Sequence, residues 1–220
     1  MPIFKASNFG NPYVGLFAKA SDRLACTDVS ASPKFISSME ALEVPIIKAT
    51  FGGAGLVGIF LCMNSNGAVL PSFCSQEEIS AFKSQGLNVE TLSGEFSAVG
   101  NNLAANDKGA IANPEMPRQQ ISKISDCLGV EVVPLRVAGY LTVGSCVVAT
   151  NRGFVAHNRA CEQELKELKE ILRVEGQNCT LNTGVPFTSL CAVANSKAAL
   201  AGESSTGFEL GRVAEALKLV

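Results

Sequence analysis

The chain has 220 residues, of which 47 % are hydrophobic and 17 % charged, and its net charge is −2. This composition provides a substantial core and excludes a disordered chain, while the lack of a run of Lys or Arg excludes a strong non-specific nucleic-acid binder. Residues 1–10 do not resemble a signal peptide, and the longest apolar run, residues 56–63, is too short to cross a bilayer. We therefore expect a soluble cytoplasmic protein.

In chain order, the same predicted elements occur five times. Each set starts with a strand, a polar turn and a second strand, beginning at Val14, Val57, Val99, Val143 and Thr188. The turns end at intervals of 43, 42, 44 and 45 residues, at Leu24, Gly67, Gly109, Gly153 and Ala198. Such a period is typical of repeated supersecondary units. We expect one domain, 1–220, with repeats at 8–50, 51–93, 94–137, 138–181 and 182–220 plus 1–7.

An amphipathic helix is predicted after each hairpin. Ser32, Ser75 and Thr206 are placed to cap the first, second and fifth helices, and Gly129 is placed to end the third. The fourth helix has the clearest helical spacing, with apolar residues at Cys161, Leu165, Leu168 and Leu172. These apolar stripes predict core positions rather than a cofactor site.

A third strand is predicted after the first four helices, at residues 44–50, 87–92, 130–137 and, more weakly, 175–180. No such strand follows the fifth helix. Residues 3–7 have strand character, however, and residues 5–15 align without gaps to residues 48–58. We therefore predict that the N-terminal strand completes the last unit, closing an α/β ring that leaves two fewer sheet edges exposed.

Residues 53–58 match G-x-G-x-x-G, the phosphate-binding turn of dinucleotide-binding folds. That motif requires a helix directly after its third glycine, whereas residues 59–63 and 68–70 are predicted as the strands of a hairpin. We therefore expect no nucleotide site. Gly58 matches Gly15, Gly100 and Gly144, with Ser189 in the fifth unit, and small residues there indicate a close approach of backbones near the ring axis.

The eight cysteines form no C-x-x-C pair and no Cys/His ligand spacing. We expect reduced thiols that are mostly core residues, with no metal site. Nothing in the sequence requires an organic cofactor.

Five strand–strand–helix–strand units in a ring resemble the pentein, or α/β-propeller, fold. Motifs in all five units resemble the translation initiation factor 6 family. They are LVG at 56–58, LP at 70–71, SAVGN at 97–101, ND at 106–107, VEV at 130–132, VGS at 143–145, TN at 150–151, Gly153, AH at 156–157, AN at 194–195 and STGFEL at 205–210. The likeness covers the full length and is to the archaeal form, although the connection at 175–190 is poorer in glycine and charge than is usual for the family.

The resemblance implies a non-catalytic function. Members of the family bind the inter-subunit face of the large ribosomal subunit, by a ribosomal protein next to the sarcin–ricin loop, and sterically block the small subunit from joining. Release involves the Shwachman–Bodian–Diamond syndrome protein family together with a translocase-like GTPase. For this chain we expect a monomer of that kind, without membrane contact.

Two alternatives remain at this point. Guanidine-modifying enzymes share the pentein fold, and they need a Cys nucleophile activated by a His. The one histidine, His157, has no carboxylate two residues on, and Cys191 lies in a predicted apolar strand, so we expect no enzyme. A scaffold with a different partner is the other alternative.

A docking surface is predicted on the side of the repeat glycines, opposite the five polar turns. Most residues that follow the repeat glycine are apolar or small, but Asn101 carries an amide. It is either a hydrogen-bonded structural residue or a contact to the ribosomal protein. We hypothesise a docking patch that consists of Asn101 with Ile59, Asn8 and Asn11.

Overall fold

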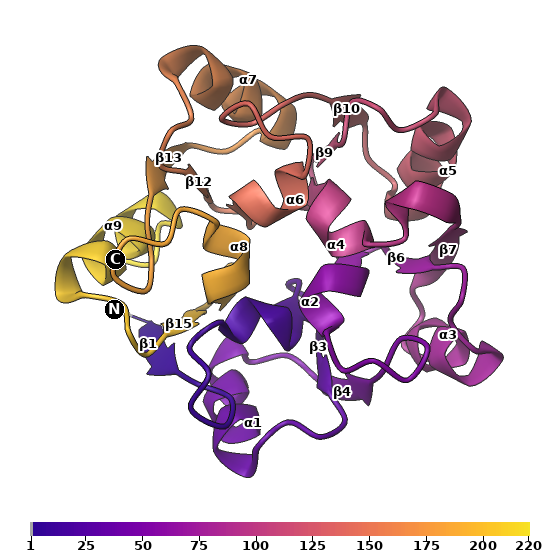
Figure 1. The fold of residues 1–220 in the computed structure, drawn as a ribbon, viewed down its shortest axis with the longest axis horizontal. Coiled ribbons are helices and arrows are strands. Elements are labelled where there is room, and N and C mark those ends of the chain that lie inside the picture. Colours follow the sequence, from indigo (N-terminus) through magenta and orange to yellow (C-terminus); the bar gives the residue numbers. More distant parts are fainter. Residues whose placement is uncertain (1) are drawn as a thin grey trace.

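Five three-stranded sheets surround a common centre, and a longer helix accompanies each sheet on the outside (Figure 1). The computed structural model describes residues 2–220. Successive units follow one another around the centre in chain order (Figure 1). The mixed α/β, five-fold repeat that the sequence predicts is therefore present.

The units consist of short elements of similar order. The first contains η1 (Val14–Leu16), β2 (Ala18–Ala20), β3 (Ala25–Asp28), α1 (Pro33–Met39), η2 (Glu40–Leu42) and β4 (Ile46–Ala49). The second contains α2 (Val57–Phe60), β5 (Cys62–Met63), β6 (Gly67–Pro71), α3 (Gln76–Lys83) and β7 (Asn88–Leu92). The third contains η3 (Gly94–Phe96), α4 (Val99–Asn102), β8 (Leu103–Ala105), β9 (Ala110–Ala112), α5 (Arg118–Leu128) and β10 (Val132–Pro134). The fourth contains α6 (Val143–Cys146), β11 (Val147–Ala149), β12 (Phe154–His157), α7 (Glu162–Leu172) and β13 (Gly176–Cys179). The fifth contains α8 (Thr188–Cys191), β14 (Ala192–Ala194), β15 (Ala199–Gly202), α9 (Gly207–Ala216) and β1 (Ile3–Ala6).

The N-terminal strand belongs to the fifth sheet. In every sheet the first strand is antiparallel to the middle strand, and the middle strand is parallel to the third. In the fifth sheet that third strand is β1, with Ile3 opposite Ala199 and Ala6 opposite Gly202. This pairing confirms that the N-terminal segment completes the last unit; Met1, the first residue of the predicted segment, lies outside the described residues.

The core consists of five apolar clusters, and each cluster joins two neighbouring units. Phe51 and Phe82, from the segment before α2 and from α3, are fully buried with Cys26 of the first unit. Another cluster joins Val193 and Leu200 of the fifth unit to the first unit. Every unit shares apolar surface with the next one, so the contact between the fifth and first units is of the same kind as the other four.

The predicted helix ends are present where local signals are strong. The Ser32 and Thr206 hydroxyls accept hydrogen bonds from the backbone N–H groups of Phe35 and Glu209, each at 3.2 Å. Ser75 forms a capping box with Glu78, and Gly129 ends α5 at φ +66°. These bonds satisfy backbone groups that a helix end otherwise leaves unpaired.

The predicted start of the first strand is wrong in all five hairpins, because a helical turn (η1, α2, α4, α6 or α8) begins where each strand was expected to begin, at Val14, Val57, Val99, Val143 and Thr188. Residues 59–63 were expected to form a strand, but Ile59 and Phe60 lie in the single helical turn α2, and the strand is only Cys62–Met63. A helical turn therefore begins inside the glycine motif, at Val57, although four residues do not make a dinucleotide-binding helix. The other motif glycines are explained by the fold, because Gly53 has φ +81° in the turn at 51–54 and a Cβ on Gly55 would crowd the Asp28 carboxylate.

The cysteines are free thiols, as expected. Seven of the eight are buried, and Cys161 is exposed at the start of α7. Burial raises the pKa of Cys62, Cys146 and Cys191 to about 12. A thiol with such a pKa is protonated at neutral pH and a poor nucleophile.

Candidate interaction surface

Five helical turns, η1, α2, α4, α6 and α8, meet around the centre in cyclic order (Figure 1). A Cβ atom on Gly58 would overlap the carbonyl oxygen of Gly15, and one on Gly100 would overlap that of Gly58. A Cβ atom on Gly144 would likewise overlap the carbonyl oxygen of Gly100. Only a residue without a side chain allows this backbone contact. The turns therefore form a continuous, tightly packed collar.

Ile59 and Asn101, two residues of the hypothesised patch, lie on adjacent turns of this collar. Ile59 belongs to α2 and Asn101 to α4, and both are half-buried. The Asn101 side-chain oxygen accepts a hydrogen bond from the Ser145 hydroxyl of α6 at 3.0 Å. This bond orients the Asn101 amide and joins the neighbouring turns α4 and α6.

Asn8 and Asn11 belong to the tight turn that precedes η1. Asn8 is buried, and its side-chain oxygen accepts a hydrogen bond from the Ser32 N–H at 2.9 Å, at the start of α1. The Asn11 side-chain oxygen accepts from the Tyr13 N–H at 2.9 Å. These two residues hold the shape of the turn beside α1, whereas Ile59 and Asn101 lie on the collar itself.

Phe9, the most unusual residue of that turn, has no signal in the sequence. Phe9 is 75 % exposed and has φ 52°. Both properties are unfavourable for a bulky aromatic residue, because the left-handed region crowds its Cβ and water solvates its ring poorly. Strained, exposed residues of this kind are concentrated at functional sites.

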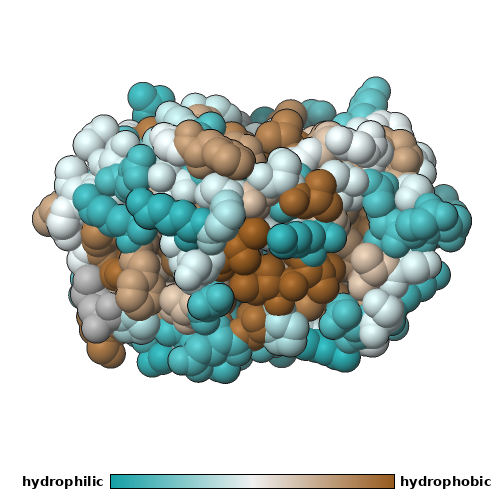
Figure 2. Space-filling model, turned by 90° about the horizontal axis from the view of Figure 1, so that it is seen from below, coloured by the Kyte–Doolittle hydropathy of each residue, from teal (hydrophilic) through white to brown (hydrophobic). Residues whose placement is uncertain are grey.

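Apolar surface is not confined to the collar side. On the rim seen from the side of α1, apolar atoms gather near the middle among hydrophilic ones (Figure 2). The large apolar residues with substantial exposure include Val29 and Phe73, of the first and second units. Exposed apolar area alone therefore does not single out a docking surface.

The five polar turns gather at one end of the central cavity and bind one another there. The Asp107 carboxylate accepts hydrogen bonds from the N–H and hydroxyl of Ser65, both at 2.7 Å, and from the Asn151 amide at 2.6 Å. Asp22 accepts from the same Asn151 amide at 2.7 Å and from the Ser196 N–H at 2.7 Å. The sequence predicts turns on one face, but their polar groups are largely used within the ring.

Buried asparagines connect three of the five units to the next unit. The Asn106 amide donates to the Thr150 carbonyl and to the Leu172 carbonyl at the end of α7, both at 2.9 Å. Asn64 and Asn195 make the equivalent pairs of bonds to their neighbours. Each amide thus holds a hairpin turn and satisfies the last carbonyl of a neighbouring helix.

The residues considered for an enzyme do not form a nucleophile–base pair. His157 is buried, and its ring packs against Tyr140 and Phe187 with centroids 5.1 Å apart in each case. Its Nδ1 atom accepts a hydrogen bond from the Arg159 N–H, and burial together with Arg159 lowers the pKa of His157. Cys191 ends the helical turn α8 instead of lying in a strand, and it is buried in a different apolar cluster.

Within residues 2–220, no group of three or more His, Cys, Asp or Glu side chains is arranged to hold a metal ion. The same residues contain no helix with the length and apolar character needed to cross a membrane.

Comparison with known proteins gives a consistent result. The sequence model of the eIF-6 family matches residues 3–216. A protein named translation initiation factor 6 from Pyrococcus abyssi is 35 % identical over 217 residues, which cover 96 % of each chain. A protein of the same name from Thermococcus onnurineus is 33 % identical, and the match covers 99 % of this chain and 98 % of that protein. Another, from Haloquadratum walsbyi, is 34 % identical, and the match covers 98 % of this chain and 96 % of that protein.

The fold and its collar thus occur in a chain that matches translation factors along its whole length. The protein belongs to the eIF-6 family. The resemblance predicted from the sequence, including its archaeal character, is confirmed. The family is non-enzymatic, so the guanidine-modifying alternative is not supported.

Proposed function

We propose that this protein binds the large ribosomal subunit and prevents its premature association with the small subunit, as a translation initiation and ribosome biogenesis factor. The observation that carries the proposal is the family match over residues 3–216, together with relatives named translation initiation factor 6. A steric blocker needs bulk and a preformed surface. The shared core clusters and the collar favour a rigid body that loses little entropy on docking.

We also assign the chain to the pentein fold. Five units of one strand order around a common centre support this assignment, as does the pairing of β1 with β15.

The docking surface proposed here is centred on Ile59 and Asn101 of the collar, with Asn11 at its margin. Asn8 contributes by fixing the turn at 8–11, and Phe9 at its tip adds an exposed aromatic ring. Aromatic anchors are frequent among the residues that dominate protein interfaces. The partner in this proposal is a ribosomal protein next to the sarcin–ricin loop, and release is carried out by the Shwachman–Bodian–Diamond syndrome protein family with a translocase-like GTPase.

Sedimentation with separated ribosomal subunits tests the proposal. We expect the protein to co-sediment with the large subunit and to remain at the top of the gradient with the small subunit alone. Equal binding to both subunits would indicate non-specific attraction. Failure to co-sediment with the large subunit at low salt would favour a scaffold for another partner and would overturn the proposal.

A further inference from the structure

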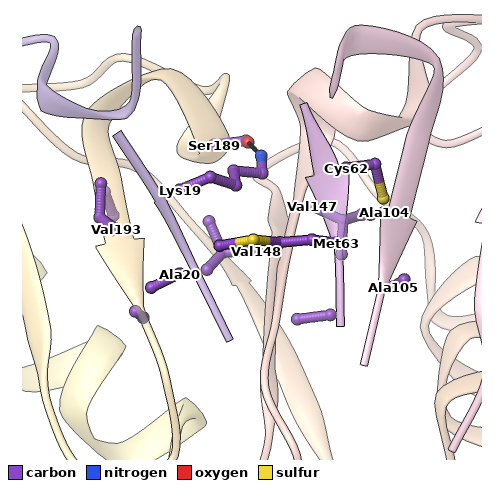
Figure 3. A pocket seen from close by; sticks show the side chains of 13 residues that line it. Lys19, Ala20, Cys62, Met63, Ala104, Ala105, Val147, Val148, Ser189 and Val193 are labelled. Atoms are coloured by element: carbon purple, nitrogen blue, oxygen red, sulfur yellow. Dashed lines mark hydrogen bonds between the residues drawn. The ribbon is translucent and has the colours of Figure 1, made fainter. Parts of the chain in front are cut away.

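A lysine lies in the part of the central cavity that the first strands of the sheets line. No other charged residue lines this part, whereas Asp22 and Asp107 lie at the polar-turn end of the cavity. The cavity has a volume of about 30 Å³ and is lined by the first strands of the five sheets, β2, β5, β8, β11 and β14, together with Ser189 (Figure 3). Lys19 occupies the middle position of β2. The residues at the same register position in the other four sheets are uncharged: Cys62, Ala104, Val148 and Val193.

Lys19 is bonded to the other residue that departs from the repeat. Its Nζ atom donates a hydrogen bond to the Ser189 hydroxyl oxygen at 3.0 Å (Figure 3). Ser189 stands at the position that is glycine in the other four units, at Gly15, Gly58, Gly100 and Gly144. The two side chains that break the five-fold pattern are therefore partners, although 170 residues separate them in the sequence.

The charge of Lys19 has no carboxylate partner in the described part of the chain. The ion pairs there join Lys169 to Glu175 and Lys197 to Glu43. Removal from bulk water lowers the pKa of Lys19, and the Cys62 thiol opposes that shift. Lys19 is half-buried. An ammonium group that is withdrawn from water without a counter-charge is costly, and such groups are normally paired.

The polar groups that Lys19 and Ser189 present to the cavity are hydrogen-bond donors. An ammonium group has three N–H bonds, and one of them is used by Ser189, whose hydroxyl accepts that bond and keeps its own proton to donate. The remaining lining consists mostly of Ala and Val side chains. A cavity of about 30 Å³ has room for no more than two or three water-sized species, which excludes nucleotides, sugars and peptides.

We propose that the cavity holds one small monovalent inorganic anion, of the size of chloride, bound by the Lys19 ammonium and the Ser189 hydroxyl. The anion supplies the missing counter-charge and the missing acceptor. It lies between the collar of helical turns and the hydrogen-bonded polar turns, among which Asp22 and Asp107 carry negative charge. The anion acts as a structural component of the ring. This inference is independent of ribosome binding.

Direct detection uses the wild-type protein, refolded and crystallised in sodium bromide. Anomalous scattering should give a bromide peak within hydrogen-bond distance of Lys19 Nζ. A cavity that contains only water, with no anomalous peak, would overturn the proposal whatever the behaviour of variants.

Stability gives a second, independent measurement. Wild-type protein is refolded in sodium chloride or in sodium gluconate of equal ionic strength, since gluconate is too large for the cavity. We expect the melting temperature to be about 2–4 °C higher in chloride. Lys19→Met should lose this difference, and the exposed control Lys166→Met should keep it. Ser189→Gly, which restores the repeat glycine and keeps the lysine, should reduce it. Equal melting temperatures of the wild-type protein in the two salts would contradict the proposal.

Discussion

The carbonyl oxygen of Ser189 occupies the space that a Cβ atom on Gly15 would need. The first and fifth units therefore touch through their backbones, in the same way that Gly58 touches Gly15 and Gly100 touches Gly58. This contact and the β1–β15 pairing both join the N-terminal part of the chain to its C-terminal part. The stability of the ring should thus depend on its seam as much as on any single unit.

Gly58→Ala tests the collar. The added methyl group would overlap the Gly15 carbonyl, so we expect the free energy of unfolding to fall by about 2–4 kcal/mol. Urea unfolding measures this loss. The matched control is Gly211→Ala in α9, where open space surrounds the new atom and a gain of up to about 1 kcal/mol is expected from helix propensity. Similar effects at the two positions would argue against the backbone contact.

Removal of residues 1–7 tests the seam. The described part of this segment includes β1, which buries Ile3 and Ala6 and pairs with β15. We expect a loss of about 2–4 kcal/mol from the buried apolar area, and aggregation through the exposed edge of β15. Thermal unfolding and light scattering report the two effects. An unchanged melting temperature would show that the N-terminal strand does not close the ring.

Asn106→Ala tests the connection between units. This buried side chain donates to Thr150 and Leu172 and accepts from the N–H groups of Lys108 and Gly109. Leaving these groups unpaired should lower the free energy of unfolding by about 2–4 kcal/mol. The exposed Asn158 is the control, and Asn158→Ala should change stability by less than about 0.5 kcal/mol. A near-neutral Asn106→Ala would mean that water replaces the amide.

Glu209 should make stability depend on pH in the acidic range. Burial opposes its ionisation, but hydrogen bonds from Thr206, Gly184 and Thr180 outweigh burial and lower the pKa of Glu209. A carboxylate with a depressed folded-state pKa stabilises above the ordinary value of 4.5, and this contribution is lost as the pH falls below it.

Urea unfolding of Glu209→Gln measures this contribution. The variant should be less stable than the wild type by about 1–3 kcal/mol at pH 7, and the difference should shrink at pH 3. A difference that is constant between these pH values would show that the ionised carboxylate is not the stabilising form.

Asn101→Arg tests the proposed docking surface. A long cationic side chain on the collar should lower affinity for the large subunit by about tenfold or more through steric conflict with the partner, while the melting temperature stays close to that of the wild type. Ser80→Arg, on the exposed side of α3, adds the same charge away from the patch and should bind normally. If Asn101→Arg folds and binds like Ser80→Arg, the patch lies elsewhere.

Local signals and the repeat made most of the fold predictable. The caps at Ser32, Ser75 and Thr206 depend on residues three positions apart, and the alignment of residues 5–15 with 48–58 predicts the position of β1. The helical turns of the collar were missed because apolar residues such as Ile59 and Phe60 are equally compatible with a short strand. Packing of neighbouring turns decides between the two.

The site was less predictable because its contacts join distant residues. Sequence spacing places the polar turns on one face, but only the structure reveals that Asp107 binds Ser65 and Asn151. The strained backbone of Phe9 has no sequence signal, since bulky residues rarely adopt a positive φ. The pairing of Lys19 with Ser189 is equally invisible in the sequence, although each residue breaks the repeat.

The most direct test of the account is a subunit-joining assay. Purified large and small subunits are mixed under conditions in which they associate, and sucrose-gradient profiles are compared with and without a several-fold excess of this protein. We expect the peak of joined ribosomes to disappear and the protein to move with the free large subunit. A joined peak that persists while the protein is bound to the large subunit would contradict the proposed function.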